Sequence, residues 1–106
     1  MRRVLFLCSR NRLRSPTAEE VFADRDGIVV DSAGLSKDAN CRLCAEQVEW
    51  AGHIVVMEKD HRRRLNEQFG ELLKGKRVSV LDIPDNYEYM QPELVELLKR
   101  RCQGII

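Results

Sequence analysis

Four short, mainly apolar segments alternate along the chain with segments of helical periodicity. The apolar segments, whose length suits buried strands, are 4–7, 28–30, 53–57 and 77–81. The helical segments are 16–25, 43–51, 60–75 and the stretch that Pro92 opens. This alternation predicts a three-layer α/β fold, in which helices cover both faces of a four-stranded parallel sheet and the crossovers are right-handed.

Length and charge limit the class of protein. With 106 residues we expect a single domain spanning 1–106, and a net charge of +1 argues against a general nucleic-acid binder. The arginines at 62–64 and 100–101 are interpreted as solvated helix ends. The first apolar segment is too short for a secretory signal or a membrane span, and four cysteines without an export signal fit a reducing compartment. We therefore expect a cytoplasmic protein that makes no membrane contact.

Cys41 and Cys44 form a Cys-x-x-Cys pair. No second cysteine pair or histidine cluster accompanies them, so the sequence predicts no metal site. Placed on a helix, the two thiols would share one face, and we expect them to have a half-buried packing role.

The loop between the first strand and the first helix carries a Cys8-x5-Arg14 spacing. A loop of this length can curl so that its backbone N–H groups converge on one anion, with the sulfur beneath it and the guanidinium on two of its oxygens. Ser15 is expected to cap the helix and Pro16 to occupy its first turn, which points the positive helix end at the anion and the thiolate. A lone cysteine also fits a packing role, but open α/β proteins bind phosphate at loops of this kind, which connect the end of a strand to the start of a helix. The spacing in this context favours a phosphate site.

Polar residues also follow the other three predicted strands. They are Asp31 with Ser32, Glu58, and the two acids Asp82 and Asp85. Because the carboxyl ends of parallel strands meet at one sheet edge, we expect these side chains to gather around the loop that follows the first strand.

Four motifs resemble those of the low-molecular-weight protein tyrosine phosphatases. They are the opening Val4–Glu19 with its anion loop, Asp31–Gly34, Val56–Glu58 and the acid-bearing Asp82–Tyr87. The resemblance implies the phosphotyrosine protein phosphatase I-like fold, with strands in the order 2-1-3-4. It also implies a phosphomonoester hydrolase that needs no cofactor and forms a phosphocysteine intermediate. Relatives are longer, and this chain lacks the aromatic wall that the family carries between Gly34 and Trp50, so it resembles a shortened member.

The resemblance also assigns roles. Cys8 is the implied nucleophile, Arg14 the phosphate clamp and Asp85 the general acid, while Asp82 remains the alternative acid. Phosphate binding falls on the whole loop: Ser9, Arg10, Asn11, Arg12, Leu13, Arg14 and Ser15.

Supporting roles are implied for further residues. Asn11 would hold the left-handed stretch of the loop, Ser15 would donate to the thiolate, and Ser32 would brace Asn11. Glu58 is either a support for Arg14 or the loop, or a surface carboxylate. Tyr87 either lines the mouth of the site or packs as an ordinary aromatic.

The loop departs from the family at Arg10, Arg12 and Leu13, where relatives carry glycine, an apolar residue and often a second cysteine. The added charges favour a small polyanionic or nucleotide phosphate as the alternative to a phosphotyrosine protein, unless both arginines simply face solvent. Inorganic phosphate is the expected product, and nucleic acid stays open as a substrate.

Two other functions remain open from the sequence. An arsenate reductase of the same fold needs two further cysteines, and Cys41 and Cys44 are not placed after the third strand as that chemistry expects. A phosphate-binding domain without turnover is the other alternative.

Overall fold

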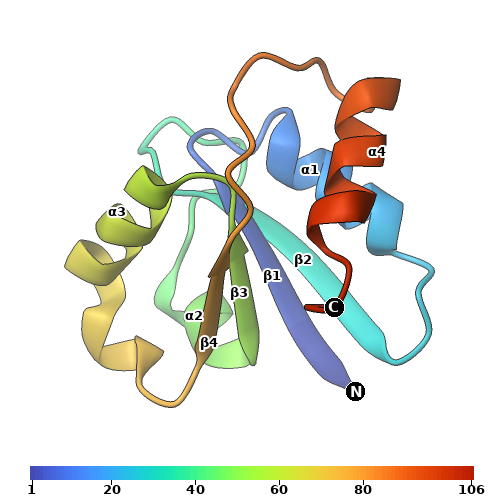
Figure 1. The fold of residues 1–106 in the computed structure, drawn as a ribbon. Helices are drawn as coiled ribbons and strands as arrows, with labels where there is room; N and C mark the ends of the chain where they lie inside the picture. The colour runs from blue at the N-terminus through green and yellow to red at the C-terminus, as the bar shows by residue number, and fades with distance from the viewer.

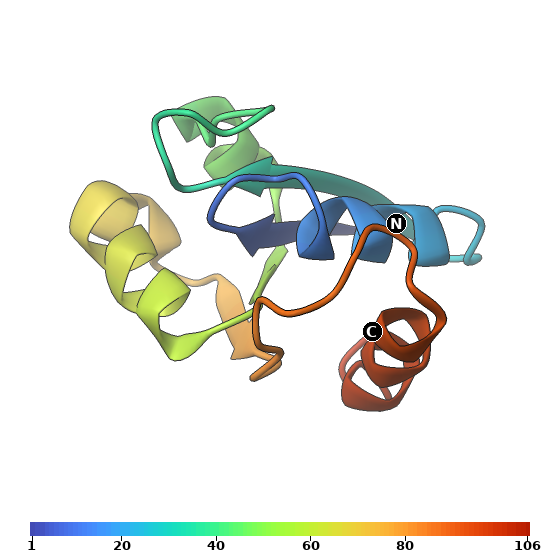
Figure 2. The same cartoon turned by 90° about the horizontal axis from the view of Figure 1, so that it is seen from above.

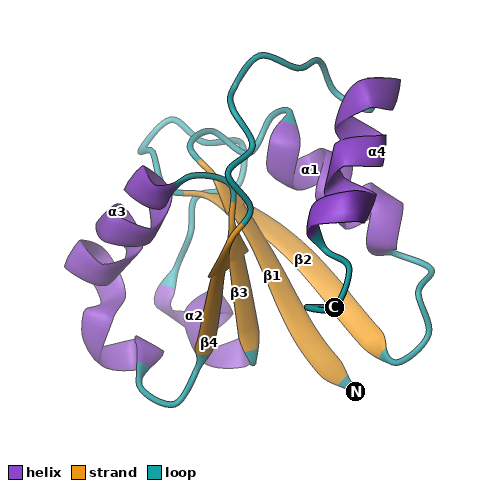
Figure 3. Cartoon of the chain, viewed as in Figure 1, coloured by secondary structure: helices purple, strands orange, loops and turns teal.

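The computed structural model describes residues 1–106 as one four-stranded sheet with four α-helices (Figures 1 and 3). The elements are β1 (Arg2–Cys8), α1 (Arg14–Phe22), β2 (Ile28–Gly34), α2 (Ala45–Trp50), β3 (His53–Val56), α3 (Lys59–Phe69), a short 3₁₀ helix (Gly70–Leu73), β4 (Arg77–Val80) and α4 (Pro92–Arg101). None of these helices has the length and apolar character needed to cross a membrane.

The strands lie in the order β2-β1-β3-β4 and every neighbouring pair is parallel, which confirms the predicted sheet. Cys8 pairs with Gly34, and Leu7 pairs with Val56 on the other side of β1. The carboxyl ends of the strands therefore share one edge, and the loops that follow them gather at the top of Figure 1.

Helices cover both faces of the sheet. The view from above shows α1 and α4 on one side, with α2 and α3 on the other (Figure 2). Successive side chains of β1 enter opposite cores, because side chains alternate along a strand and this strand is covered on both faces. Phe6 joins the cluster beneath α1 and α4, whereas Leu5 and Leu7 join the cluster beneath α2 and α3.

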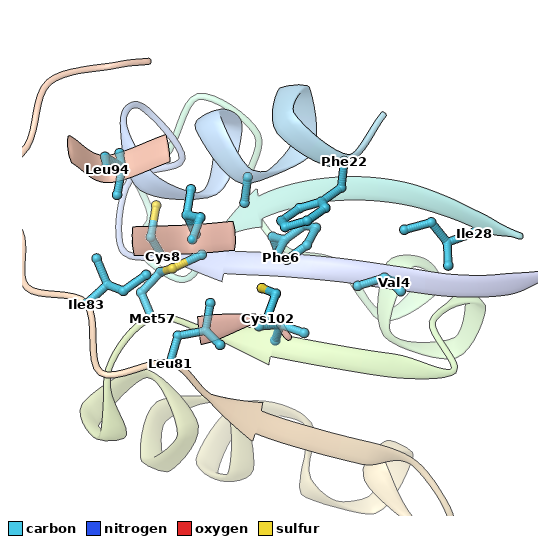
Figure 4. Close-up of a cluster of buried hydrophobic side chains, with 13 residues drawn as sticks. Val4, Phe6, Cys8, Phe22, Ile28, Met57, Leu81, Ile83, Leu94 and Cys102 are labelled. Atoms are coloured by element: carbon cyan, nitrogen blue, oxygen red, sulfur yellow. The ribbon is translucent and has the colours of Figure 1, made fainter. Parts of the chain in front are cut away.

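The core beneath α1 and α4 reaches directly to the anion loop. Cys8 lies at one end of this cluster with Met57, Ile83 and Leu94, all of them buried (Figure 4). The stacked rings of Phe6 and Phe22, whose centroids are 5.7 Å apart, fill the middle. Cys8 is thus fixed on the packed core and does not lie at a loop tip.

The segment that carries Cys41 and Cys44 is extended and not helical. Gly34 donates its N–H to the Cys41 carbonyl at 2.8 Å, and the Leu43 N–H donates back to Gly34 at 2.8 Å. These bonds hold the segment against the end of β2, so α2 begins only at Ala45. Both thiols are exposed, and the predicted half-buried role on a helix face is wrong.

The predicted cap of the first helix is also wrong. α1 begins at Arg14, so Ser15 lies inside the first turn and its hydroxyl is bonded elsewhere. The N-cap of α3 is Glu58, two residues before the expected helical segment 60–75. Glu58 and His61 form a reciprocal box, in which each side chain accepts from the backbone N–H of the other.

Candidate active site

Cys8 ends β1, and its side chain is almost fully buried. Its Sγ lies 3.0 Å from the Ser15 hydroxyl, which accepts a hydrogen bond from Asn11 Nδ2 at 2.9 Å. The hydroxyl proton of Ser15 is therefore free to point at sulfur, because the alternative acceptor, the Ala33 carbonyl, is farther away at 3.4 Å. A donor in this position stabilises the thiolate form of Cys8.

Asn11 takes the left-handed conformation, with φ of 54°. Its side-chain amide donates hydrogen bonds to two hydroxyls, that of Ser15 at 2.9 Å and that of Ser32 at 3.0 Å. Ser32 in turn donates to the Glu19 carboxylate. A strained turn persists only where its surroundings hold it, and here β2 and α1 do so through one buried amide.

Arg14 is buried at the start of α1, and its guanidinium is held from two sides. Its Nη1 donates to Glu58 Oε2 at 2.5 Å and to the Ile83 carbonyl at 2.8 Å, while Nε lies 3.7 Å from Asp85 Oδ1. Glu58 therefore lies against the arginine rather than standing free at the surface. The Nη2 group has no protein acceptor and is available for an anion.

The two candidate acids lie in different places. Asp85 lines the same cavity as Cys8, whereas Asp82 faces a separate surface hollow beside Lys59. Ile83 explains the difference, because its N–H donates to the Met57 carbonyl at 2.8 Å and its carbonyl accepts from Arg14. This anchor leaves Asp82 outside and brings Asp85 to the guanidinium.

A cavity of about 610 Å³ opens above the loop. Its lining is formed by Cys8, Ser9, Arg10, Arg12, Leu13, Arg14, Ser36 and Asp85. Tyr87 is absent from this lining; it packs against the core and borders a groove along α4 instead. The lining of this cavity therefore includes no aromatic side chain.

The segment 36–40 forms one wall of the site, which the sequence did not reveal. Arg12 donates to the Asn40 side chain at 3.2 Å and to the Asp38 carbonyl at 3.1 Å, and Arg10 lies 3.7 Å from the Asp38 carboxylate. The two loop arginines thus reach toward this wall and do not simply extend into solvent.

Gly34 permits the wall to approach. A Cβ at this position would lie 2.5 Å from the Ala39 Cβ and 2.7 Å from the Ser9 carbonyl oxygen. The signal for this contact in the sequence was Gly34 at the end of the Asp31–Gly34 motif, because a glycine often marks a position where another backbone segment approaches closely.

α3 contributes two further side chains to the loop. His61 Nε2 and Arg64 Nη1 each lie 3.1 Å from the Ser9 hydroxyl. Burial and the nearby Arg14 lower the pKa of His61 to about 4, so its ring is neutral near pH 7. The interpretation of Arg64 as part of a solvated helix end is wrong. The i, i+3 spacing that places both side chains on one helix face was the available signal.

Comparison with known proteins agrees with the motifs. No protein-family model matches the chain. Over 65% of its length it is 26% identical to a protein-arginine-phosphatase of Geobacillus stearothermophilus, of which the alignment spans 63%. It is 27% identical to a protein-arginine-phosphatase of Bacillus subtilis, over 96% of this chain and 95% of that protein. That second alignment extends over 143 positions against the 106 residues of this chain, so the relative contains segments that are missing here.

Solved structures share the fold. A low-molecular-weight protein tyrosine phosphatase from Streptococcus pyogenes superposes with a TM-score of 0.79 at 18% identity, covering 97% of this chain and 89% of that one. A cysteine-to-serine variant of the YwlE arginine phosphatase, which has a phosphorylated active-site serine, superposes with a TM-score of 0.71 at 23% identity and covers 97% of both chains. The chain therefore has the fold of the low-molecular-weight protein tyrosine phosphatases, and its sequence is similar to those of two protein-arginine-phosphatases.

Proposed function

We propose that this protein removes phosphoryl groups from phosphorylated protein side chains through a phosphocysteine on Cys8. The observation that carries the proposal is the meeting of a thiol, a guanidinium and a carboxylate in one cavity: Cys8, Arg14 and Asp85 all line it. A nucleophile, an electrostatic clamp and a proton donor are what phosphoryl transfer to a thiolate requires.

In the first step the Cys8 thiolate attacks phosphorus and the bond from phosphorus to the leaving atom breaks. Asp85, in its protonated form, donates its proton to the leaving oxygen or nitrogen. Arg14 holds two equatorial phosphoryl oxygens with its free edge, and its orientation is already set by Glu58 and the Ile83 carbonyl. The products of this step are the dephosphorylated side chain and the S-phosphoryl enzyme.

In the second step water attacks the phosphocysteine. The Asp85 carboxylate takes a proton from that water, the sulfur–phosphorus bond breaks, and inorganic phosphate leaves. The thiolate returns to its hydrogen bond with Ser15. The phosphorylated active-site serine in the YwlE variant supports a covalent route of this kind.

The substrate side chain is either phosphotyrosine or phosphoarginine. Phosphotyrosine follows from the family motifs. Phosphoarginine is favoured by the similarity to two protein-arginine-phosphatases and by the cavity, whose lining has no aromatic side chain to stack on a tyrosyl ring.

The test is a turnover panel with the purified chain. Phosphate release is measured from an aryl phosphate, a phosphotyrosine peptide, a phosphoarginine peptide and a nucleoside monophosphate, with Cys8→Ser as the control. We expect turnover of the aryl phosphate and of one phosphopeptide. Thioredoxin-dependent arsenate reduction without phosphate release would instead establish the reductase, and binding of phosphate without turnover of any substrate would establish a binding domain.

A further inference from the structure

The hydroxyl of Ser9, the residue directly after the nucleophile, is held by two side chains of α3. His61 Nε2 and Arg64 Nη1 each lie 3.1 Å from Ser9 Oγ. All three side chains are at least partly buried. The role that the family motifs imply for this position concerns the loop backbone, so the contacts of the hydroxyl need a separate explanation.

The hydrogen-bond network decides which atom of His61 carries the proton. The Glu58 backbone N–H donates to His61 Nδ1 at 3.1 Å, so Nδ1 is an acceptor. In a neutral imidazole the other nitrogen is then protonated. His61 Nε2–H therefore donates to Ser9, and the hydroxyl accepts.

Arg64 can only donate, because a guanidinium has no acceptor. Its Nη1 donates to Ser9, and its Nη2 donates to the Ser36 hydroxyl at 3.2 Å. A serine hydroxyl has two lone pairs and one proton. Both lone pairs of Ser9 are thus occupied, while its proton has no acceptor in the protein.

The remaining direction for that proton is the cavity, which Ser9 lines together with Cys8 and Arg14. We infer that the Ser9 hydroxyl donates a hydrogen bond to a phosphoryl oxygen of the substrate, and that His61 and Arg64 are positioning residues that aim it. The inference rests on the proposed function, because it requires the phosphoryl group to occupy this cavity. Ser9 then supplies the pocket with a side-chain donor that is oriented before the substrate arrives.

The first experiment compares Ser9→Ala with Ser9→Thr. Removing a hydrogen bond to a charged oxygen should lower kcat/KM by about 10- to 100-fold and weaken competitive inhibition by orthovanadate by a similar factor. Ser9→Thr keeps the hydroxyl and should recover most of both quantities. Equal losses in Ser9→Ala and Ser9→Thr, or no loss in Ser9→Ala, would overturn the inference.

Ser79→Ala is the matched control. Ser79 also pairs its hydroxyl with a buried histidine, since Ser79 Oγ lies 2.8 Å from His53 Nε2, but this pair is in β3 and β4 and outside the cavity. This variant should bind vanadate and turn over substrate at rates within about twofold of the parent. A loss as large as that of Ser9→Ala would mean that any serine–histidine pair in this sheet has the same effect, and would contradict a specific role for Ser9.

A double-mutant cycle tests the positioning role. Arg64→Ala and His61→Gln should each lower kcat/KM in the parent but have much smaller effects in the Ser9→Ala background, because the group they aim is then absent. Losses of the same size in both backgrounds would show that Arg64 acts through its charge alone, and would refute positioning. Vanadate binding separates the failure of this inference from the failure of the proposed function. If the protein turns over no substrate, the phosphatase proposal is refuted, but the effect of Ser9→Ala on vanadate affinity can still be measured.

Discussion

The Arg14 guanidinium and the Glu58 carboxylate form a contact that joins the anion loop to the start of α3, with 2.5 Å between Nη1 and Oε2. Arg14 is almost fully buried, while the Glu58 side chain is 41% exposed. The guanidinium is therefore oriented by a carboxylate that solvent still reaches. This arrangement leaves Nη2 of Arg14 without an acceptor in the protein.

We expect Glu58→Gln to lower kcat/KM by about fivefold to tenfold, the difference between a charge-assisted and a neutral hydrogen bond. The loss should appear with aryl phosphate and with phosphopeptide alike, because it concerns the phosphoryl group. Glu67→Gln is the control, since Glu67 forms an exposed pair with Arg63 on the same helix. Unchanged kinetics in Glu58→Gln would show that Arg14 needs no such support.

Cys8→Ser should abolish turnover while the loop and Arg14 still bind phosphate or vanadate. A serine oxygen leaves phosphorus far less readily than sulfur, so the variant should also accumulate phosphoserine when it is incubated with substrate. Intact-protein mass spectrometry checks for the added phosphoryl group, with the exposed Cys41→Ser as the control. Hydrolysis of an aryl phosphate by Cys8→Ser near the parent rate would rule out the covalent mechanism.

Asp85→Asn should slow turnover by about 10²–10⁴-fold for a poor leaving group and much less for nitrophenolate, which needs little protonation. Asp82→Asn should retain activity with both, because Asp82 faces a different hollow. The measurement is kcat across a series of aryl phosphates of graded leaving-group pKa. A leaving-group-dependent defect in Asp82→Asn and not in Asp85→Asn would reverse the assignment.

Arg10 and Arg12 lead to a prediction about substrate specificity. If they read the substrate, kcat/KM should favour polyanionic phosphomonoesters and fall steeply with added salt, and Arg10→Gly combined with Arg12→Ile should shift preference back toward phosphotyrosine. Their contacts with Asp38 and Asn40 favour the competing view, in which they hold the wall of the site. An unchanged substrate ranking in the double variant would establish that second view.

The two buried histidines make stability depend on pH. Burial is the main cause that lowers the pKa of both His53 and His61 from 6.5 to about 4. Between these pH values the unfolded chain binds protons that the native protein does not, so the free energy of unfolding should fall as pH falls from about 6.5 to about 4. The loss is on the order of 3 kcal/mol per histidine.

Urea denaturation at several pH values in this window checks the dependence, with His53→Gln as the comparison. Removing one histidine should flatten the decline, whereas the carboxylates that titrate in the same range remain common to both proteins. An identical pH slope for parent and variant would contradict the shifted pKa of His53.

The fold and the centre of the site could be predicted because their signals are local. Short apolar runs and helical stripes are read from adjacent residues, and a parallel sheet follows from their alternation. Cys8 and Arg14 lie in one loop, so their spacing alone indicates that both side chains can contact the same anion. Asn11, Ser15 and Ser32 were found through the family motifs, and the structure brings the three together.

Other features required the packed structure, because they depend on how elements far apart in the chain approach one another. The sequence left Asp82 open as the alternative to Asp85 for the acid near the loop. In the structure, the hydrogen bonds of Ile83 to Met57 and Arg14 leave Asp82 outside the cavity that Asp85 lines. The amphipathic pattern of α3 predicts which of its side chains face the core, but it does not predict which residues its polar side chains contact.

From the amino-acid sequence alone, the four-stranded parallel α/β fold and a phosphate loop that carries Cys8 and Arg14 could be predicted. The packing of distant segments was needed to show that Asp85 lines the cavity, that segment 36–40 lies against Gly34, and that Arg64 and His61 contact Ser9. The physical reason is that hydrogen-bond partners 20 or more residues apart are selected by how the helices pack on the sheet, and the identity of such polar partners leaves no periodic pattern in the sequence.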